Sequence, residues 1–244
     1  MPFDPHAEEF AARVHALDPW WFAFEAGGHT FGGRVPRDTN KVDLFFDWAQ
    51  RFGGVQTILE LGAHEGNHTL QLAGRPGVRR VVGLEGREDN VRRAQLVLEA
   101  LAPPNVEFRQ YNLERFEPAE FAGFDAVFCS GLLYHLPQPW TLIRKVAGIC
   151  RFLYLDTHYA ATEEAVVGPY HGRWYKEGSD PLSGLSERSF WLSFKDLILV
   201  LMESGFLVRY VHDGGNGEGD RAWLFAEQVG AAQVGCRRPA PASE

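Results

Sequence analysis

The segment 58–73 carries two overlapping patterns that predict different chemistry. His64-Glu65-Gly66-Asn67-His68 spells H-E-x-x-H, in which two histidines one helical turn apart hold zinc beside a glutamate base. The same residues follow an apolar run that ends at Glu60 and a Gly-containing turn, and they lead into an amphipathic stretch. That order is typical of the turn between strand and helix where a parallel sheet binds a nucleotide.

The placement of glycine favours the second interpretation. Gly62 and Gly66 bracket His64, and glycine is the poorest helix residue after proline. We therefore expect His64 and Glu65 to lie in the turn, with the helix beginning near Gly66 or Asn67. No recognisable spacing marks a third zinc ligand farther along the chain. The pattern predicts a cofactor turn and no metal site.

A second acid indicates what the turn binds. Glu85 ends the next apolar run after Glu60, where an open α/β sheet presents a carboxylate to ribose hydroxyls. The alternative is a strand-end charge that faces solvent. The turn has neither the G-x-G-x-x-G pattern that holds a pyrophosphate nor the Lys-Ser/Thr pair of a phosphate-binding loop. A ligand with a ribose and no phosphates, such as S-adenosylmethionine (SAM), fits this pattern.

These residues need a scaffold that brings strand ends together. From residue 57 onward, apolar strand-like runs alternate with helical patterns, which is typical of βαβ units. The prediction is an α/β fold, a doubly wound Rossmann-like sheet of seven strands with helices on both faces, mostly parallel with the last strand antiparallel. The expected strands are 57–61, 80–85, 106–111, 125–129, 150–155, 206–211 and 222–227, and the expected helices are 67–73, 88–101, 137–148 and 194–204.

The chain divides into three parts. Residues 1–52 predict an N-terminal helical cap of two helices around a Gly-rich aromatic stretch, 20–28. Residues 53–228 predict the cofactor-binding domain, in which 157–192 is a long unpatterned insertion and a candidate lid. Residues 229–244 are rich in Ala, Pro, Gly and Arg without periodicity and predict a disordered tail.

Composition narrows the possible partners. A formal charge of −8 argues against broad binding to nucleic acid, because phosphate contacts need a basic face. The absence of a signal peptide and of a long apolar stretch predicts a cytoplasmic protein with no membrane partner. Cys129, Cys150 and Cys236 lack metal or redox spacing, so we expect buried free thiols. The oligomeric state stays open, with a homodimer among the options.

Four motifs occur in an order that points to one family. They are LELGAHEG at 59–66, VGLE at 82–85, YNLE at 111–114 and FDAVFCSGLLYHL at 124–136. With them the chain resembles the class I SAM-dependent methyltransferases over roughly residues 40–227. The resemblance implies SAM as cofactor and S-adenosylhomocysteine (SAH) as product.

The resemblance also implies a role for each cofactor residue. Glu60 and Gly62 would serve the methionine part, Glu85 the ribose, and Ser130 would lie near the sulfonium. Asn112 and its neighbour would flank adenine, at a place where the family more often has Asp. The complete predicted cofactor set is Glu60, Gly62, Ala63, Asn67, His68, Glu85, Gly86, Asn112, Leu113 and Ser130.

A narrower resemblance concerns the group that is transferred. The stretch 131–135, the Trp-rich lead-in and 189–191 are similar to the bacterial tRNA uridine-5-oxyacetic acid synthases, which transfer a carboxymethyl group from carboxy-SAM. By position, Lys41, Tyr134 and Arg221 match the residues with which that family holds the cofactor carboxylate. Because this chain is acidic, we interpret it as a relative with a different substrate.

The acceptor should lie beyond the carboxyl ends of strands 125–129 and 150–155. Tyr134, His135 and His158 follow those ends and are the candidate catalytic residues, since histidine can take a proton near neutral pH. The alternative for each histidine is a hydrogen-bonded loop residue. The aromatic and basic residues of the insertion predict acceptor contacts or else an aromatic mini-core: Tyr170, Arg173, Trp174 and Trp191.

The leading hypothesis is methyl transfer from SAM to a hydroxyl or amine of a small-molecule acceptor, as in small-molecule biosynthesis. Placing the nucleophile about 3 Å from the methyl carbon supplies much of the acceleration, so a strong base is not obligatory. The alternatives are carboxymethyl transfer from carboxy-SAM, a SAM-binding protein without catalysis and, last, zinc-dependent hydrolysis.

Overall fold

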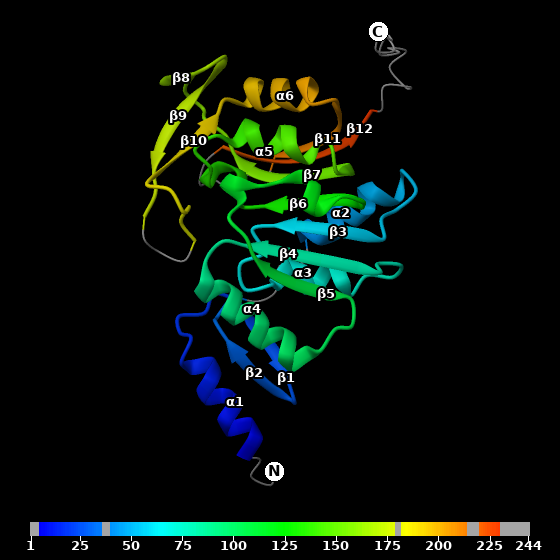
Figure 1. The fold of residues 1–244 in the computed structure, drawn as a ribbon, viewed down its shortest axis with the longest axis vertical. Coiled ribbons are helices and arrows are strands. Elements are labelled where there is room, and N and C mark those ends of the chain that lie inside the picture. Colours follow the sequence, from blue (N-terminus) through cyan, green and yellow to red (C-terminus); the bar gives the residue numbers. More distant parts are fainter. Residues whose placement is uncertain (1–4, 36–39, 179–181, 214–219, 230–244) are drawn as a thin grey trace, which may run out of the picture.

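A seven-stranded sheet forms the centre of the computed structural model, which describes residues 5–35, 40–178, 182–213 and 220–229. Five adjacent strands pair in parallel, and the last strand pairs antiparallel with both of its neighbours, as predicted (Figure 1). Across the sheet the strands are β11 (Phe206–Asp213), β12 (Arg221–Gln228), β7 (Cys150–His158), β6 (Phe124–Ser130), β3 (Thr57–Leu61), β4 (Arg80–Glu85) and β5 (Val106–Gln110).

The strand order indicates where a ligand can bind at the edge of the sheet. β3 lies between β4 and β6, so the connections leaving β3 and β6 run to opposite sides of the sheet. Such a switch point opens a crevice at the carboxyl ends of the strands. The turns after β3, β4 and β6 therefore meet at one edge.

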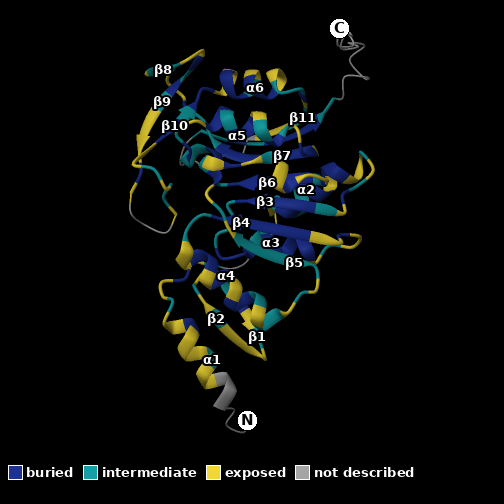
Figure 2. Cartoon of the chain, in the orientation of Figure 1, coloured by how far each residue is buried: buried dark blue, intermediate teal, exposed yellow. Residues whose placement is uncertain are grey.

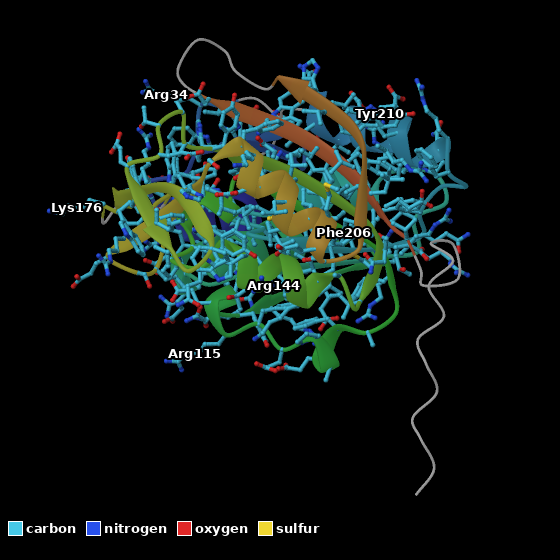
Figure 3. The ribbon with its side chains drawn as sticks, turned by 90° about the horizontal axis from the view of Figure 1, so that it is seen from above. Arg34, Arg115, Arg144, Lys176, Phe206 and Tyr210 are labelled. Atoms are coloured by element: carbon cyan, nitrogen blue, oxygen red, sulfur yellow. The ribbon has the colours of Figure 1, made fainter. Side chains whose placement is uncertain are left out.

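Helices cover both faces of the sheet, because successive strand residues point to opposite sides. On one face, Ile58 and Phe128 pack under α2 (Asn40–Gln50) and α3 (Asn67–Ala73). On the other, Leu59 packs in the core with α5 (Pro139–Val146) and α6 (Phe194–Glu203). Figure 3 shows α5 and α6 on the same side of the sheet, and Figure 2 shows the buried central strands.

The N-terminal part differs from the predicted helical cap. α1 (Pro5–His15) is present, but the aromatic stretch forms a hairpin of β1 (Ala23–Ala26) and β2 (His29–Gly32). The turn between them has positive φ at both Gly27 and Gly28, a conformation that suits glycine. Trp20, Phe24 and Phe31 pack with α4 (Glu88–Leu101), whereas α2 packs on the main sheet.

The insertion is more ordered than its sequence pattern indicates. It contains an antiparallel sheet of β8 (Ala165–Val167), β9 (Tyr170–Lys176) and β10 (Arg188–Leu192), at the opposite end of the molecule from α1 (Figure 1). Short 3-10 helices complete the described elements: η1 (Leu113–Arg115), η2 (Pro118–Phe121) and η3 (Leu133–His135).

Two segments in the C-terminal part of the chain lie outside the described residues. The tail 230–244, which includes Cys236, lies outside the described residues. So does 214–219, between β11 and β12, which pair antiparallel with each other. Among the helices that are described, none is long and apolar enough to span a membrane.

Candidate active site

The turn after β3 has the geometry that its glycines predict. Gly62 and Gly66 adopt φ values of 79° and 81°, His64 adopts 50°, and α3 begins at Asn67. A Cβ on Gly66 would lie 2.4 Å from Cζ of Phe108, so only glycine fits there. The two histidines of the H-E-x-x-H string therefore do not share one helix, which zinc chelation requires.

The glutamate of that string has a structural partner. Its carboxylate oxygens accept the backbone N–H groups of Trp21 and Phe22, at 2.8 and 2.9 Å. Glu65 thus fixes the N-terminal chain against the turn. Within the described ranges, no group of three or more His, Cys, Asp or Glu side chains is placed to hold a metal.

Backbone donors hold Glu85 at the end of β4. One carboxylate oxygen accepts the N–H of His64 and the other accepts the N–H of Arg87, both at 2.9 Å. The side chain is therefore set by the turn on one side and by the start of α4 on the other. Each oxygen keeps a lone pair for a further donor.

Glu60 lies behind the turn and is 1% exposed. Burial raises the pKa of this carboxyl group to about 8, against the hydrogen bond donated by the Thr69 hydroxyl. Nδ1 of His68 lies 3.7 Å from Oε1 of Glu60. Glu60 and His68 thus form a polar pair at the base of the site.

A cavity of about 310 Å³ opens over these residues. Apart from the buried Glu60, every residue of the predicted cofactor set lines it. Of the three candidate catalytic residues, Tyr134 and His135 line it. Its wall also contains residues that the sequence prediction did not include: Trp21, Phe22, His64, Arg87, Asn90, Tyr111, Glu114, Leu132, Leu136 and 182–185.

A buried charge network stands at the other end of this cavity. The side chain of Asp156 is fully buried. Its carboxylate accepts hydrogen bonds from Lys41 Nζ and Ser130 Oγ, both at 2.8 Å. It also accepts from Nε and Nη2 of Arg221, at 2.5 and 2.8 Å. Burial alone would raise its pKa, but Arg221 and Lys41 outweigh that effect and lower the pKa of Asp156 to about 2. Two cations and one carboxylate leave one net positive charge facing the cavity.

The network joins residues that lie far apart in the sequence. Lys41 comes from α2, Asp156 from β7 and Arg221 from β12. Lys41, Tyr134 and Arg221, which the narrower resemblance selected, all line the same cavity. The structure adds Asp156 as the carboxylate that already binds both cations.

His158 lies behind Tyr134 and not among the residues that line the cavity. Its ring stacks on Trp191 at 5.0 Å and meets the Tyr134 ring edge-on at 4.7 Å. Burial and the Arg221 charge lower its pKa. Nδ1 lies 3.2 Å from the Asp220 carbonyl oxygen.

His135 has a different environment. It belongs to η3 and lines the cavity, and its Nδ1 lies 3.1 and 3.0 Å from the two carboxylate oxygens of Glu177. The Glu177 side chain is 1% exposed. The sequence prediction did not include Glu177, because it lies in the unpatterned insertion.

The residues of the insertion that we expected to contact the acceptor lie outside the cavity wall. Tyr170 is in the core, and its hydroxyl hydrogen-bonds with Arg144 and Glu203. The Arg188 guanidinium lies over the Trp174 ring, 4.1 Å from the ring centroid. None of the four residues predicted for this role lines the cavity; their aromatic and basic groups pair with one another or with neighbouring residues. The part of the insertion that lines it is Leu182, Ser183, Gly184 and Leu185.

Known proteins resemble the chain at the level of sequence. Residues 58–152 match a family described as a methyltransferase domain. Over 177 residues the chain is 28% identical to the tRNA U34 carboxymethyltransferase of Trichlorobacter lovleyi. The aligned region covers 70% of this chain and 53% of that protein. The enzyme of the same name from Citrifermentans bemidjiense is 26% identical over 69% of this chain and 52% of its own length. The chain thus spans about half the length of the curated relatives it matches.

Solved structures resemble it over most of its length. The N-terminal domain of EvdMO1, crystallised in the presence of SAH and D-fucose, is 31% identical, with a TM-score of 0.78, and the match covers 93% of this chain and 100% of that one. Magnesium protoporphyrin IX methyltransferase from Synechocystis PCC 6803 shares the fold, with 19% identity and a TM-score of 0.57 over 78% of this chain and 79% of that one. The chain therefore belongs to the family of SAM-dependent methyltransferases.

Proposed function

We propose that this protein transfers the methyl group of SAM to a hydroxyl of a small molecule. The observation that carries the proposal is a single cavity with two unlike ends. One end presents Glu85, a carboxylate set by backbone donors, and the other presents Lys41 and Arg221, set by Asp156.

The cofactor end has the donor set that an adenosyl ligand needs. The lone pairs left on Glu85 suit two vicinal ribose hydroxyls, because a carboxylate accepts both bonds at once. Leu113 and Asn112 also line the cavity and would take the adenine. Asn67 and His68, in the first turn of α3, would take the amino-acid end.

The acceptor end favours a hydroxyl over an amine. Its net positive charge would repel a protonated amine and stabilise negative charge that develops on an oxygen. A relative that is 31% identical was crystallised with SAH and D-fucose. We therefore propose a sugar hydroxyl as the acceptor class.

When bound, SAM supplies an electrophilic methyl group on its sulfonium. In the proposed reaction the acceptor oxygen would form a bond to that carbon while the carbon–sulfur bond breaks, with SAH as the leaving product. In this proposal His135 takes the acceptor proton, Lys41 and Arg221 stabilise the oxygen, and Tyr134 shapes the wall beside them. His158 supports the Tyr134 ring from behind.

Carboxymethyl transfer is the second candidate, since two relatives carry that name and their suggested carboxylate ligands meet here. Against it stands Asp156, which neutralises one of the two cations and so leaves less positive charge for a cofactor carboxylate than an unpaired Lys and Arg would. Calorimetry with SAM and carboxy-SAM separates the two. We expect tighter binding of SAM, with little change in that preference in Lys41→Ala; a preference for carboxy-SAM that Lys41→Ala removes would support the second candidate.

Methyl transfer is tested with labelled SAM and a panel of acceptors that includes D-fucose, other sugars, amines and tRNA. We expect label in a sugar and none in the amines or tRNA, and we expect Glu85→Ala to abolish transfer at low SAM. The matched control is Glu88→Ala, which removes an exposed carboxylate three residues farther on. SAM binding without transfer to any acceptor would support a non-catalytic SAM-binding protein.

A further inference from the structure

We propose that Glu177 is a positioning residue that couples closure over the cofactor to the setting of His135 as the base. This inference rests on the proposed function and adds a link between the two ends of the cavity. The segment 182–186 is called the lid segment below.

Glu177 holds two groups at once. Its carboxylate lies 3.0 and 3.1 Å from Nδ1 of His135, and its Oε2 accepts the N–H of Gly184 at 2.7 Å. A carboxylate accepts hydrogen bonds and donates none, so Nδ1 of His135 carries the proton in this pair. The lone pair is then on Nε2, which is the nitrogen left for an acceptor in the cavity.

The lid segment belongs to the cofactor end. Leu182, Ser183, Gly184 and Leu185 line the cavity. The Arg87 guanidinium donates to the carbonyl oxygens of Ser183 and Gly184, each at 2.9 Å. At the far side, the Ser186 hydroxyl donates to the Glu114 carboxylate at 2.8 Å.

Close packing makes this link direct. A Cβ on Gly86, the residue after Glu85, would lie 2.7 Å from Cδ1 of Leu185. A Cβ on Gly184 would lie 2.6 Å from the His135 carbonyl oxygen and 3.1 Å from Cδ of Glu177. The lid segment therefore contacts the loop after Glu85 on one side and the His135 backbone on the other.

A coupling follows from these contacts. If the lid segment opens, Glu177 loses the Gly184 N–H and the packing that fixes its carboxylate against His135. A ligand that binds the closed segment more tightly shifts the population toward closure and thereby orders His135. The base is then in place chiefly when the cofactor is present.

Nitrogen-15 NMR of the His135 ring in the full chain tests the pairing, without acceptor and with SAH as the probe. We expect the Nδ1-protonated tautomer in the wild type, with a sharper signal when SAH is bound. Glu177→Gln keeps an oxygen for Gly184 but can turn an NH₂ toward His135, so we expect the Nε2-protonated tautomer and nearly unchanged SAH affinity. The same tautomer in both proteins would overturn the proposal.

Calorimetry with SAH tests the lid. Glu177→Ala removes both contacts, and loss of one charge-assisted hydrogen bond corresponds to a roughly tenfold weaker affinity. Gly184→Ala serves as a second variant if Glu177→Ala does not fold, and it should weaken SAH and broaden the His135 signal. The matched control is Glu187→Gln, an exposed carboxylate one residue beyond the lid segment, for which we expect no change in either readout.

Unchanged SAH affinity and unchanged His135 signal in folded Glu177→Ala or Gly184→Ala would refute the coupling. Failure of SAH to bind the wild type would refute the proposed function itself. In that case the tautomer of the ligand-free protein still reports whether Glu177 holds His135.

Discussion

The two ends of the cavity are built in different ways. The cofactor end uses short-range contacts, since the turn after β3 and the end of β4 are joined by backbone donors to Glu85. The acceptor end uses buried charges brought together from α2, β7 and β12. One end is set by the local path of the chain and the other by the completed fold, so mutations should damage them differently.

The largest expected effect is at the acceptor end. Asp156→Ala leaves Lys41 and Arg221 without their carboxylate, and breaking a buried ion pair costs about 3–5 kcal/mol of unfolding free energy. Urea unfolding at pH 7 measures it. The control is Asp43→Ala, whose carboxylate is 47% exposed and whose loss should cost about 1 kcal/mol or less. Equal losses in both variants would contradict the account.

The same network should give an acid-dependent loss of stability. The folded-state pKa of Asp156, about 2, lies below its ordinary value of 3.8. The stabilisation is therefore present above pH 4 and is lost as the pH falls toward 2. Asp156→Asn should flatten the stability curve over that window. A curve as steep as that of the wild type would mean that other carboxylates control it.

The next effect concerns binding at the cofactor end. Glu85→Ala leaves the His64 and Arg87 N–H groups without their acceptor. In the folded variant it should also remove two charge-assisted hydrogen bonds to the ribose, which corresponds to a roughly 100-fold weaker affinity for SAH. Calorimetry measures it, with Glu88→Ala as the control. A loss of less than threefold would show that Glu85 does not hold the ligand.

A comparison of two glycines distinguishes backbone strain from lack of space for a Cβ atom. Gly66 and Gly77 have φ values of 81° and 87°, but only Gly66 has a neighbour, Phe108, in the way of a Cβ. Overpacking should make Gly66→Ala about 1–3 kcal/mol less stable than Gly77→Ala. Equal values from thermal unfolding would mean that conformation alone requires glycine in the turn.

The last prediction concerns stability at alkaline pH. Burial raises the folded-state pKa of Glu60 to about 8, above its ordinary 4.5, so its stabilising contribution is complete below pH 4.5 and is lost as the pH rises through 8. Glu60→Gln should therefore gain stability relative to the wild type between pH 5 and pH 9, by up to roughly 4 kcal/mol. No relative gain would indicate that Glu60 ionises without difficulty.

The difference between the cofactor and acceptor ends of the cavity also explains which elements and residues the sequence could predict. The sheet, the start of α3 at Asn67 and the span of α4 follow from apolar periodicity and glycine placement. The cofactor residues lie within these units, so local patterns found them. The hairpin after Trp20 was missed, although Gly27-Gly28 between aromatic residues is a turn signal.

At the acceptor end, the narrower resemblance selected Lys41, Tyr134 and Arg221, but no local pattern indicated the carboxylate that joins the two cations. Asp156 lies in an apolar strand, and nothing near it in the sequence indicates the two cations that it binds. Glu177 and the lid segment lie in an insertion without periodicity. The conspicuous aromatic residues of that insertion pack with neighbouring arginines and rings, so composition pointed to the wrong part of it for the cavity wall.

A crystal structure of the protein with SAH tests the central claim most directly. We expect both ribose hydroxyls within hydrogen-bonding distance of Glu85 and the sulfur at the Ser130 end of the cavity, facing Lys41 and Tyr134. SAH bound outside this cavity, or with its ribose away from Glu85, would contradict the account.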